Sequence, residues 1–231
     1  MVITGAAGGI GSALVETCLA AGYTVVAVLR EGSSAPIHFP NSPSLMFEYA
    51  DISERHQVQS LSTRLSHKYP AITWLIHCAG HIAQEDEMRT IDESFAVNIF
   101  APIILSLSLK DSIVSGGGIL FVSSTAGLWG SDKAPIYAAS KSSLHGFSLS
   151  MQKILGDGRR SIVVAPGPTN TPMRELFAHD ADKHQSARTV SELILNDILE
   201  TGGTHDQDIY VIRNGEISRI QIEPVSAIAP N

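Results

Sequence analysis

The chain has 231 residues, of which 44% are hydrophobic and 17% are charged, and its formal net charge at pH 7 is −7. This composition is typical of a globular protein with a buried core, and it excludes a disordered or low-complexity chain. The excess of acidic over basic residues argues against the basic face of a nucleic-acid-binding protein.

Both cysteines, Cys18 and Cys78, lie in apolar segments and are expected to be reduced core residues, which favours a cytoplasmic protein. No apolar run approaches the length expected of a membrane span, and the N-terminus lacks the pattern of a signal peptide. We therefore expect one cytoplasmic domain over residues 1–231, without a membrane or nucleic-acid partner.

The N-terminal half alternates between strand and helix patterns. MVIT predicts a short strand, GAAGGIG a glycine-rich turn, and SALVETCLAAG a helix that ends at Gly22. Continuous apolar runs such as TVVAVL are typical of buried parallel strands. The further expected elements are strands at 24–29, 45–52 and 72–80, a loop at 31–44, and a helix at about 54–69 capped by Asp51 and Ser53.

The C-terminal half continues this alternation. We expect helices at about 87–94, 95–115, 134–155 and 187–201, strands at 118–124 and 161–167, and a loop or substrate lid at 168–185. Asn214-Gly215 within 208–222 predicts a C-terminal β-hairpin, followed by a tail at 223–231. Strands that alternate with helices predict an α/β fold, a Rossmann-like doubly wound parallel sheet of about seven strands flanked by helices.

A tyrosine and a lysine stand four residues apart in the stretch SSTAGLWGSDKAPIYAASK, residues 123–141. In a helix, Tyr137 and Lys141 share one face, and a nearby ammonium lowers the pKa of a phenol from its usual value of about 10. A phenol tuned in this way can exchange a proton with a hydroxyl or carbonyl oxygen. Such a pair is also common by chance, so its meaning depends on the surrounding motifs.

The turn Thr4-Gly5-Ala6-Ala7-Gly8-Gly9-Ile10-Gly11 joins the first strand to the first helix. A pyrophosphate can rest on the N–H groups of such a helix N-terminus, because glycine lets the backbone approach closely. The spacing differs from GxGxxG, and the alternative is a tight turn that binds no ligand. Its position after the first strand of a doubly wound fold favours a dinucleotide.

Several motifs occur in the order typical of one family. They are Thr4-Gly5-x-x-x-Gly9-Ile10-Gly11, Asp51, Ala79-Gly80, Asn98, Ser124, Tyr137-x-x-x-Lys141 and Pro166-Gly167. With this series, and with Ser124 thirteen positions before Tyr137, the chain resembles the short-chain dehydrogenase/reductase family over about residues 1–175. Each motif alone is weak, whereas the ordered series is specific.

The resemblance implies a role for each of these positions. Tyr137 would be the general acid/base, and Lys141 would hold the ribose hydroxyls and lower the Tyr137 pKa. Ser124 would bond the substrate oxygen, and Asn98 would support a water chain leading to Lys141. The cofactor-binding residues that the resemblance implies are Gly5, Gly8, Gly9, Ile10, Gly11, Arg30, Asp51, Ile52, Cys78, Ala79, Gly80, Tyr137, Lys141, Pro166, Gly167, Thr169 and Thr171.

The end of the second predicted strand bears on the choice of cofactor. Family members that use NAD commonly carry an acid there for the ribose 2′-hydroxyl, and this chain has Leu29 followed by Arg30. A guanidinium suits a 2′-phosphate, so NADP(H) is expected in preference to NAD(H). Gly8, which stands where many NADP-dependent members have a second base, and the adjacent Glu31 argue in the other direction.

The remaining polar residues do not suggest a metal. His77 and His81 flank a strand-end turn without a third ligand at suitable spacing, and His179 and His184 lie in the predicted polar lid with Asp180 and Asp182. No metal is therefore expected. Cys78 stands where the family has an asparagine, which is expected to weaken hydrogen bonding between strands without loss of activity.

The expected function is that of an NADP(H)-dependent oxidoreductase that interconverts a carbonyl and a secondary alcohol. Two alternatives are a dinucleotide-binding sensor or regulatory protein without turnover, and a nucleotide-sugar epimerase or dehydratase, for which too few residues follow Gly167. The short polar lid disfavours a bulky steroid as substrate. Family members pair the helices that correspond to 95–115 and 134–155, so a homodimer or homotetramer is expected.

Overall fold

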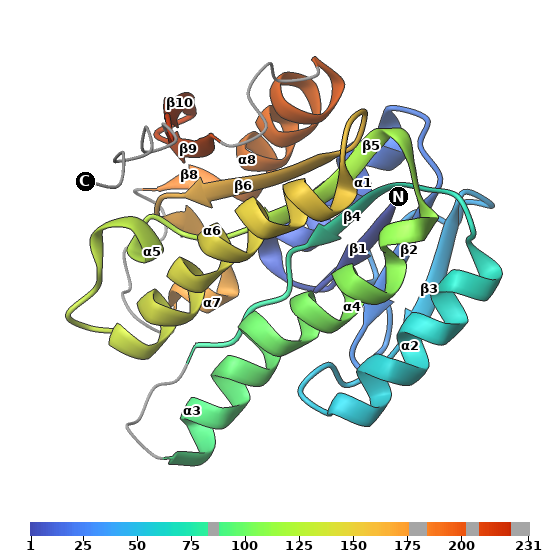
Figure 1. Ribbon diagram of the computed structural model, residues 1–231, viewed down its shortest axis with the longest axis horizontal. Coiled ribbons are helices and arrows are strands. Elements are labelled where there is room, and N and C mark those ends of the chain that lie inside the picture. Colours follow the sequence, from blue (N-terminus) through green and yellow to red (C-terminus); the bar gives the residue numbers. More distant parts are fainter. Residues whose placement is uncertain (83–87, 176–183, 202–207, 223–231) are drawn as a thin grey trace, which may run out of the picture.

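The computed structural model describes residues 1–82, 88–175, 184–201 and 208–222, and its centre is an eight-stranded sheet (Figure 1). The strands lie in the order β10-β9-β6-β5-β4-β1-β2-β3. Neighbouring strands are parallel, apart from the antiparallel pair β9 and β10. Their bounds are β1 Val2–Thr4, β2 Val25–Leu29, β3 Leu45–Tyr49, β4 Ile72–His77, β5 Ile113–Val122, β6 Arg160–Pro166, β9 Ile209–Arg213 and β10 Glu216–Ile220.

The strand order reverses between β1 and β4. From β1 the chain continues to β2 and β3 on one side, whereas β4 leads to β5 and β6 on the other. At such a reversal the connections after two adjacent strands diverge and leave a crevice at their C-terminal ends, where doubly wound proteins bind ligands. The predicted Rossmann-like fold is therefore confirmed, with β10 as an additional edge strand.

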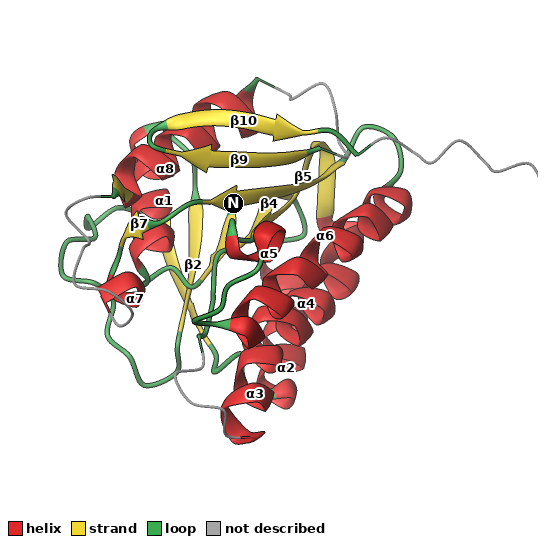
Figure 2. Cartoon of the chain, turned by 90° about the vertical axis from the view of Figure 1, so that its left-hand side faces the viewer, coloured by secondary structure: helices red, strands yellow, loops and turns green. Residues whose placement is uncertain are grey.

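Helices cover both faces of the sheet, as Figure 2 shows. On one face lie α1 (Gly9–Ala20), α8 (Ala187–Leu193) and η4 (Ile194–Glu200), and on the other α2 (Arg55–Lys68), α4 (Ala101–Leu109) and α6 (Pro135–Leu155). The remaining helical segments are α3 Met88–Phe95, η1 Ala96–Phe100, η2 Lys110–Ser112, α5 Ala126–Trp129 and α7 Pro172–Glu175.

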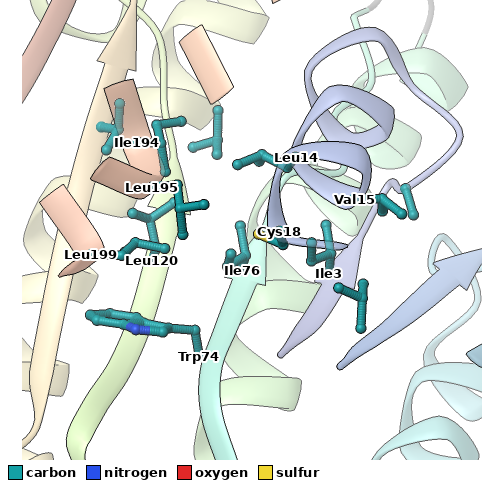
Figure 3. Close-up of a cluster of buried hydrophobic side chains, with 14 of the residues drawn as sticks. Ile3, Leu14, Val15, Cys18, Trp74, Ile76, Leu120, Ile194, Leu195 and Leu199 are labelled. Atoms are coloured by element: carbon teal, nitrogen blue, oxygen red, sulfur yellow. The ribbon is translucent and has the colours of Figure 1, made fainter. Parts of the chain in front are cut away.

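The core between α1, η4 and the sheet is apolar and fully closed (Figure 3). Leu14 and Cys18 from α1 meet Ile76 of β4 and Leu195 of η4, and all four side chains are completely buried. Each such aliphatic side chain stabilises the fold by roughly 1.5–3 kcal/mol. Burial also raises the pKa of the Cys18 thiol to about 12, so this cysteine behaves as an apolar core residue.

Strand β5 starts earlier than the sequence predicts, at Ile113 instead of residue 118. The strand includes Gly117 and Gly118, and at both positions the backbone of a neighbouring strand approaches so closely that only glycine fits. A Cβ atom at Gly117 would lie 2.0 Å from the carbonyl oxygen of Thr73, and one at Gly118 would lie 2.2 Å from that of Arg160. Here glycine permits a strand to continue, whereas the sequence pattern indicates a break.

The helix predicted at 95–115 is also modified, since it contains the π-helical turn η1 and ends at Leu109. The stretch Thr90–Ser112 has 23 residues and contains an 18-residue window with a mean hydropathy of 1.4, so by length and composition it is long enough to cross a membrane. The expectation that no segment reaches such a length is wrong by this measure. Ala101, Leu105 and Leu109 are nevertheless buried against the sheet, as in an ordinary core helix.

The predicted C-terminal hairpin is confirmed. Asn214 and Gly215 join β9 to β10 with φ angles of 53° and 78°, a combination typical of a type I′ turn. Within the lid predicted at 168–185, β7 (Thr169–Asn170) pairs in parallel with β8 (Gln185–Ser186). Residues 176–183 of that lid, and the tail predicted at 223–231, lie outside the described residues.

Candidate active site

The glycine turn between β1 and α1 is packed against the end of β4. Gly5 has a φ of +65°, and a Cβ atom there would lie 2.5 Å from Ala79 Cα. A Cβ atom at Gly11 would lie 2.1 Å from the carbonyl oxygen of Gly5. Any other residue at either position would therefore force the turn apart.

The N-terminus of α1 opens into this turn. Its N-cap residue is Gly8, which has no side chain to bond the first N–H groups, and its first turn carries no acid. Such an N-terminus is suited to an anion such as a phosphate. Thr171 lies directly across the turn, because a Cβ atom at Gly9 would come within 2.4 Å of its methyl carbon.

Arg30 and Asp51 form an ion pair where β2 and β3 end. Arg30 donates from Nε to Asp51 Oδ2 at 3.0 Å, and its Nη2 lies 2.9 Å from the same oxygen. Asp51 Oδ1 accepts from the N–H and hydroxyl groups of Ser53 at 3.1 and 2.7 Å. Although partial burial acts to raise it, these bonds and the Arg30 charge hold the pKa of Asp51 below its usual value.

The cap expected from Asp51 and Ser53 is a wrong prediction. The N-cap of α2 is Glu54, and it receives no side-chain cap hydrogen bond. The physical reason is that the Asp51 carboxylate is already occupied by Ser53 and Arg30, so it closes its own turn and does not reach the helix.

Helix α6 places Tyr137 and Lys141 on one face, beside the end of β5. Lys141 Nζ lies 5.7 Å from the centre of the Tyr137 ring and donates to the carbonyl oxygen of Val122 at 2.9 Å. Ser124 follows β5, and its hydroxyl oxygen accepts from the N–H of Ala126 at 3.1 Å. All three side chains line the same cavity.

Burial governs the ionisation of both groups on α6. It raises the pKa of Tyr137 to about 12, with the neighbouring Ser124 acting in the opposite direction, and it lowers the pKa of Lys141 to about 8. The expected lowering of the Tyr137 pKa is therefore wrong. Removal of the phenol from water is the largest cause of the increase, and the nearby Cys78 acts in the same direction. At neutral pH Tyr137 is a protonated phenol, which can donate a proton.

Asn98 lies in η1, just behind these residues, and connects two segments. Its Oδ1 accepts from the N–H of His81 at 2.8 Å, and its Nδ2 donates to the carbonyl oxygen of His81 at 2.7 Å. Nδ2 also donates to Ser140 Oγ at 2.8 Å, and Ser140 in turn donates to the carbonyl oxygen of Tyr137 at 2.8 Å. Asn98 thus fixes the segment after β4 relative to α6.

A cavity of about 650 Å³ brings the predicted residues together. Ser124, Tyr137 and Lys141 line it, and so does every residue of the predicted cofactor-binding set, including Gly8, Arg30 and Cys78. Asn98 is placed differently, because it is buried outside the lining. Lining residues that were not predicted include His81, Ile82, Glu93, Val97, Ser131, Lys133 and Arg174.

Only some of these additional residues could have been predicted from the sequence. His81 directly follows the Ala79-Gly80 turn, and that adjacency is a signal that could have identified it. Glu93 and Arg174 come from the helices α3 and α7 and Lys133 from a loop, and no local pattern states which way their side chains face. Among the described residues, no group of three or more His, Cys, Asp or Glu side chains is arranged to hold a metal.

Cys78 stands in place of an asparagine whose side-chain amide would connect neighbouring strands. Burial raises the pKa of its thiol to about 12, so it stays protonated. The hydroxyl of Thr4 makes the connection between β1 and β4, since it donates to Ile76 O at 3.5 Å and accepts from the N–H of Ala79 at 3.4 Å. Both contacts are long, which agrees with the weak bonding expected here.

Comparison with known proteins gives matches to one family. The sequence profile described as short chain dehydrogenase matches residues 1–182. An uncharacterized short-chain type dehydrogenase/reductase of Sinorhizobium fredii, y4vI, is 33% identical over 181 residues, which are 75% of this chain and 33% of the relative. This chain thus spans about a third of the length of that relative.

Two further similarities cover most of this chain and most of the protein compared with it. The 3-oxoacyl-[acyl-carrier-protein] reductase FabG of Escherichia coli is 28% identical over 190 residues, 78% of this chain and 77% of the relative. The crystal structure of a short chain dehydrogenase from Burkholderia cenocepacia in complex with NADP has a TM-score of 0.79 at 22% identity, and the match covers 92% of this chain and 95% of that one. At this identity the structural likeness shows the fold.

Proposed function

Because the chain belongs to the short-chain dehydrogenase family, we propose that it is an NADP(H)-dependent oxidoreductase that interconverts a small carbonyl compound and a secondary alcohol. The observation that carries this proposal is that the glycine turn lines the same cavity as Ser124, Tyr137 and Lys141. A dinucleotide held by the turn would therefore adjoin a group able to transfer a proton.

The chain's own residues fit a nicotinamide dinucleotide. The glycine turn exposes the N-terminus of α1, which would hold the pyrophosphate, and Asp51-Ile52 would border the adenine. Arg30 supports the choice of NADP(H), since its guanidinium retains N–H groups beyond the Nε–H that is bonded to Asp51.

In the direction of reduction, Tyr137 donates its phenolic proton to the carbonyl oxygen of the substrate. When bound, the reduced cofactor supplies the hydride that the carbonyl carbon accepts. Ser124 donates a hydrogen bond to the same oxygen and so stabilises the negative charge that develops on it. The Lys141 ammonium stabilises the phenolate that Tyr137 becomes, and a proton from solvent restores the phenol.

A screen of NADPH oxidation against small ketones, aldehydes and sugars tests this proposal. With any substrate found, Tyr137→Phe should lower kcat at least about 100-fold, because the proton donor is lost, and should leave the Kd for NADPH nearly unchanged. Tyr23→Phe removes the same oxygen outside the cavity and serves as the matched control. Full activity of Tyr137→Phe would contradict the mechanism, and cofactor binding without turnover of any compound would favour a non-catalytic sensor.

We further propose that the protein is a homodimer or homotetramer built on α4 and α6. Phe100, Leu107 and Ile154 are 42–45% exposed, although they are large and apolar. They belong to η1, α4 and α6, which lie on the same face of the sheet (Figure 2). Sedimentation equilibrium at micromolar concentration should give at least twice the chain mass, and Leu107→Glu should lower it to that of a monomer.

A further inference from the structure

The side chain of Gln185 hydrogen-bonds three separate parts of the chain. This residue lies in β8, directly before Ser186, which caps α8. Its Nε2 donates to the carbonyl oxygen of Ile212 at 3.0 Å and to Thr169 Oγ1 at 3.3 Å, while its Oε1 accepts from the N–H of Gly215 at 3.2 Å. Donor and acceptor groups of this amide are therefore all engaged within the protein.

One of the three partners belongs to the wall of the cavity. Thr169 is buried and lines the cavity, and its hydroxyl donates to the carbonyl oxygen of Gly167 at 2.9 Å while it accepts from Gln185. The hydroxyl of Thr171 donates to the carbonyl oxygen of Thr169 at 3.3 Å, and its methyl group lies against the glycine turn at Gly9. Gln185 is thus bonded to a segment, residues 166–171, that belongs to the proposed cofactor-binding set.

The other two partners belong to the C-terminal hairpin, which does not line the cavity. Ile212 lies near the end of β9, and its carbonyl oxygen also accepts from the N–H of Gly167 at 2.7 Å. Gly215 forms the turn of the hairpin together with Asn214. The end of β9 is therefore bonded to segment 166–171 directly, and the turn of the hairpin is bonded to it through Gln185.

We infer that Gln185 is a positioning residue through which the C-terminal hairpin fixes segment 166–171, and with it the affinity for the nicotinamide dinucleotide. Without the amide, Thr169 loses a donor and the turn loses the acceptor of its Gly215 N–H. A ligand would then have to order a less restrained wall, which weakens its binding. The identity of the ligand rests on the proposed function, whereas the connection between hairpin and wall does not.

The test begins with Gln185→Met, which removes the amide and keeps the length of the side chain. We expect the Kd for NADPH, measured by calorimetry, to rise at least about fivefold, because the free protein is less well ordered. An unchanged Kd would overturn the inference. The expected effect comes from a residue that does not itself line the cavity.

Gln152 provides a matched control. Its Nε2 donates to the carbonyl oxygen of Arg159 at 3.0 Å, and its Oε1 accepts from the N–H of Ser161 at 2.7 Å. This amide also joins separate elements, but it does so at the start of β6, away from the end that lines the cavity. Gln152→Met should leave the Kd for NADPH unchanged. An equal rise in Kd in both variants would indicate a general loss of stability and contradict a positioning role for Gln185.

A change in the hairpin turn tests whether the hairpin acts through Gln185. Gly215 has a φ of +78°, so Gly215→Ala strains the turn and displaces the N–H that Gln185 accepts. We expect a Kd for NADPH at least about threefold higher, and no further rise when this change is added to Gln185→Met. Gly22→Ala, at a φ of +86° in the turn after α1, is the control. Independent, multiplying effects of the two changes would overturn the inference.

Hydrogen exchange of the protein without cofactor separates this inference from the proposed function. In Gln185→Met the amides of segment 166–171 should exchange at least about 10-fold faster than in the unmodified protein, and in Gln152→Met they should not. Unchanged exchange in Gln185→Met overturns the inference. Faster exchange in a protein that binds neither NADPH nor NADH supports the positioning of segment 166–171 and contradicts the proposed function.

Discussion

Arg30 donates a hydrogen bond from Nε to Asp51 Oδ2 at 3.0 Å, and its Nη2 forms an ion pair with the same oxygen at 2.9 Å, across the end of the cavity proposed for adenosine. In this pair, Arg30 would attract the 2′-phosphate of NADP(H), whereas Asp51 would repel it. Since Arg30 is 75% exposed on its side chain, the pair contributes little to folding stability. Its expected importance lies in its effect on the preference between NADP(H) and NAD(H).

Substitutions at this pair should change the cofactor preference in opposite directions. Arg30→Gln removes the cation and should lower the ratio of kcat/KM with NADPH to that with NADH by about 10-fold. Asp51→Asn removes a negative charge and should raise the same ratio a few-fold, because solvent screens the repulsion. Asp111→Asn, in the exposed Lys110–Asp111 pair, is the control. A lower ratio in Asp51→Asn would instead mean that Asp51 serves to orient Arg30.

Removal of Asn98 should affect both stability and catalysis more than removal of its neighbour Ser140. Asn98→Ala leaves three hydrogen-bonding partners without their bond, including both backbone groups of His81. We expect a loss of about 2–4 kcal/mol in the free energy of unfolding, measured with urea, and a kcat at least about 10-fold lower. Ser140→Ala should lose about 1 kcal/mol. Equal effects of the two variants would show that Asn98 does not position His81.

The pH profile of reduction should report Lys141. Burial lowers its pKa to about 8, whereas the pKa of Tyr137 is raised to about 12, so Lys141 loses its charge first as the pH rises. We expect kcat/KM to fall above about pH 8 as the ammonium that stabilises the phenolate is lost. Lys141→Arg keeps its charge throughout this range and should abolish the fall, although the overall rate is lower. An unchanged alkaline limb in this variant would assign the limb to another group.

Much of the fold could be predicted because local patterns and tertiary packing agree. TVVAVL forms β2, and the pattern at 134–155 forms α6 almost residue for residue. The sequence AVNIF, by contrast, has no feature that distinguishes it from ordinary helix. Its π-helical turn accompanies the bonds of Asn98 to His81 and Ser140, which only the tertiary structure brings within reach.

Some features of the candidate site could likewise be predicted from the sequence, and others could not. The order of motifs places the glycine turn, Ser124, Tyr137 and Lys141 in one cavity, because each motif follows a particular strand or opens a particular helix. The Tyr137 pKa could not be predicted, since it depends on how completely the phenol is removed from water. Nor could the position of Glu93 in the cavity, which depends on the face that α3 turns toward His81.

His77 should make the folded state sensitive to acid. It is buried in β4, with its ring stacked on Phe121 at a centroid distance of 5.1 Å and its Nε2 2.9 Å from Ser106 Oγ. Burial, assisted by the charge of Lys141, lowers its pKa from 6.5 to about 3. Between these two values the unfolded state binds more protons than the folded state, so the free energy of unfolding rises with pH across this window.

Lowering the pH from 7 to 5 should therefore cost about 2 kcal/mol through His77 alone, as measured by urea unfolding at both values. His77→Phe removes this titration, and the stability difference between pH 7 and pH 5 should shrink by about that amount. The comparison of two pH values cancels the separate effect on Ser106, which loses its partner in the variant at either pH. His56→Phe, at an exposed histidine, should leave the difference as it is. If His77→Phe retained the full acid sensitivity, the source would lie in other titrating groups.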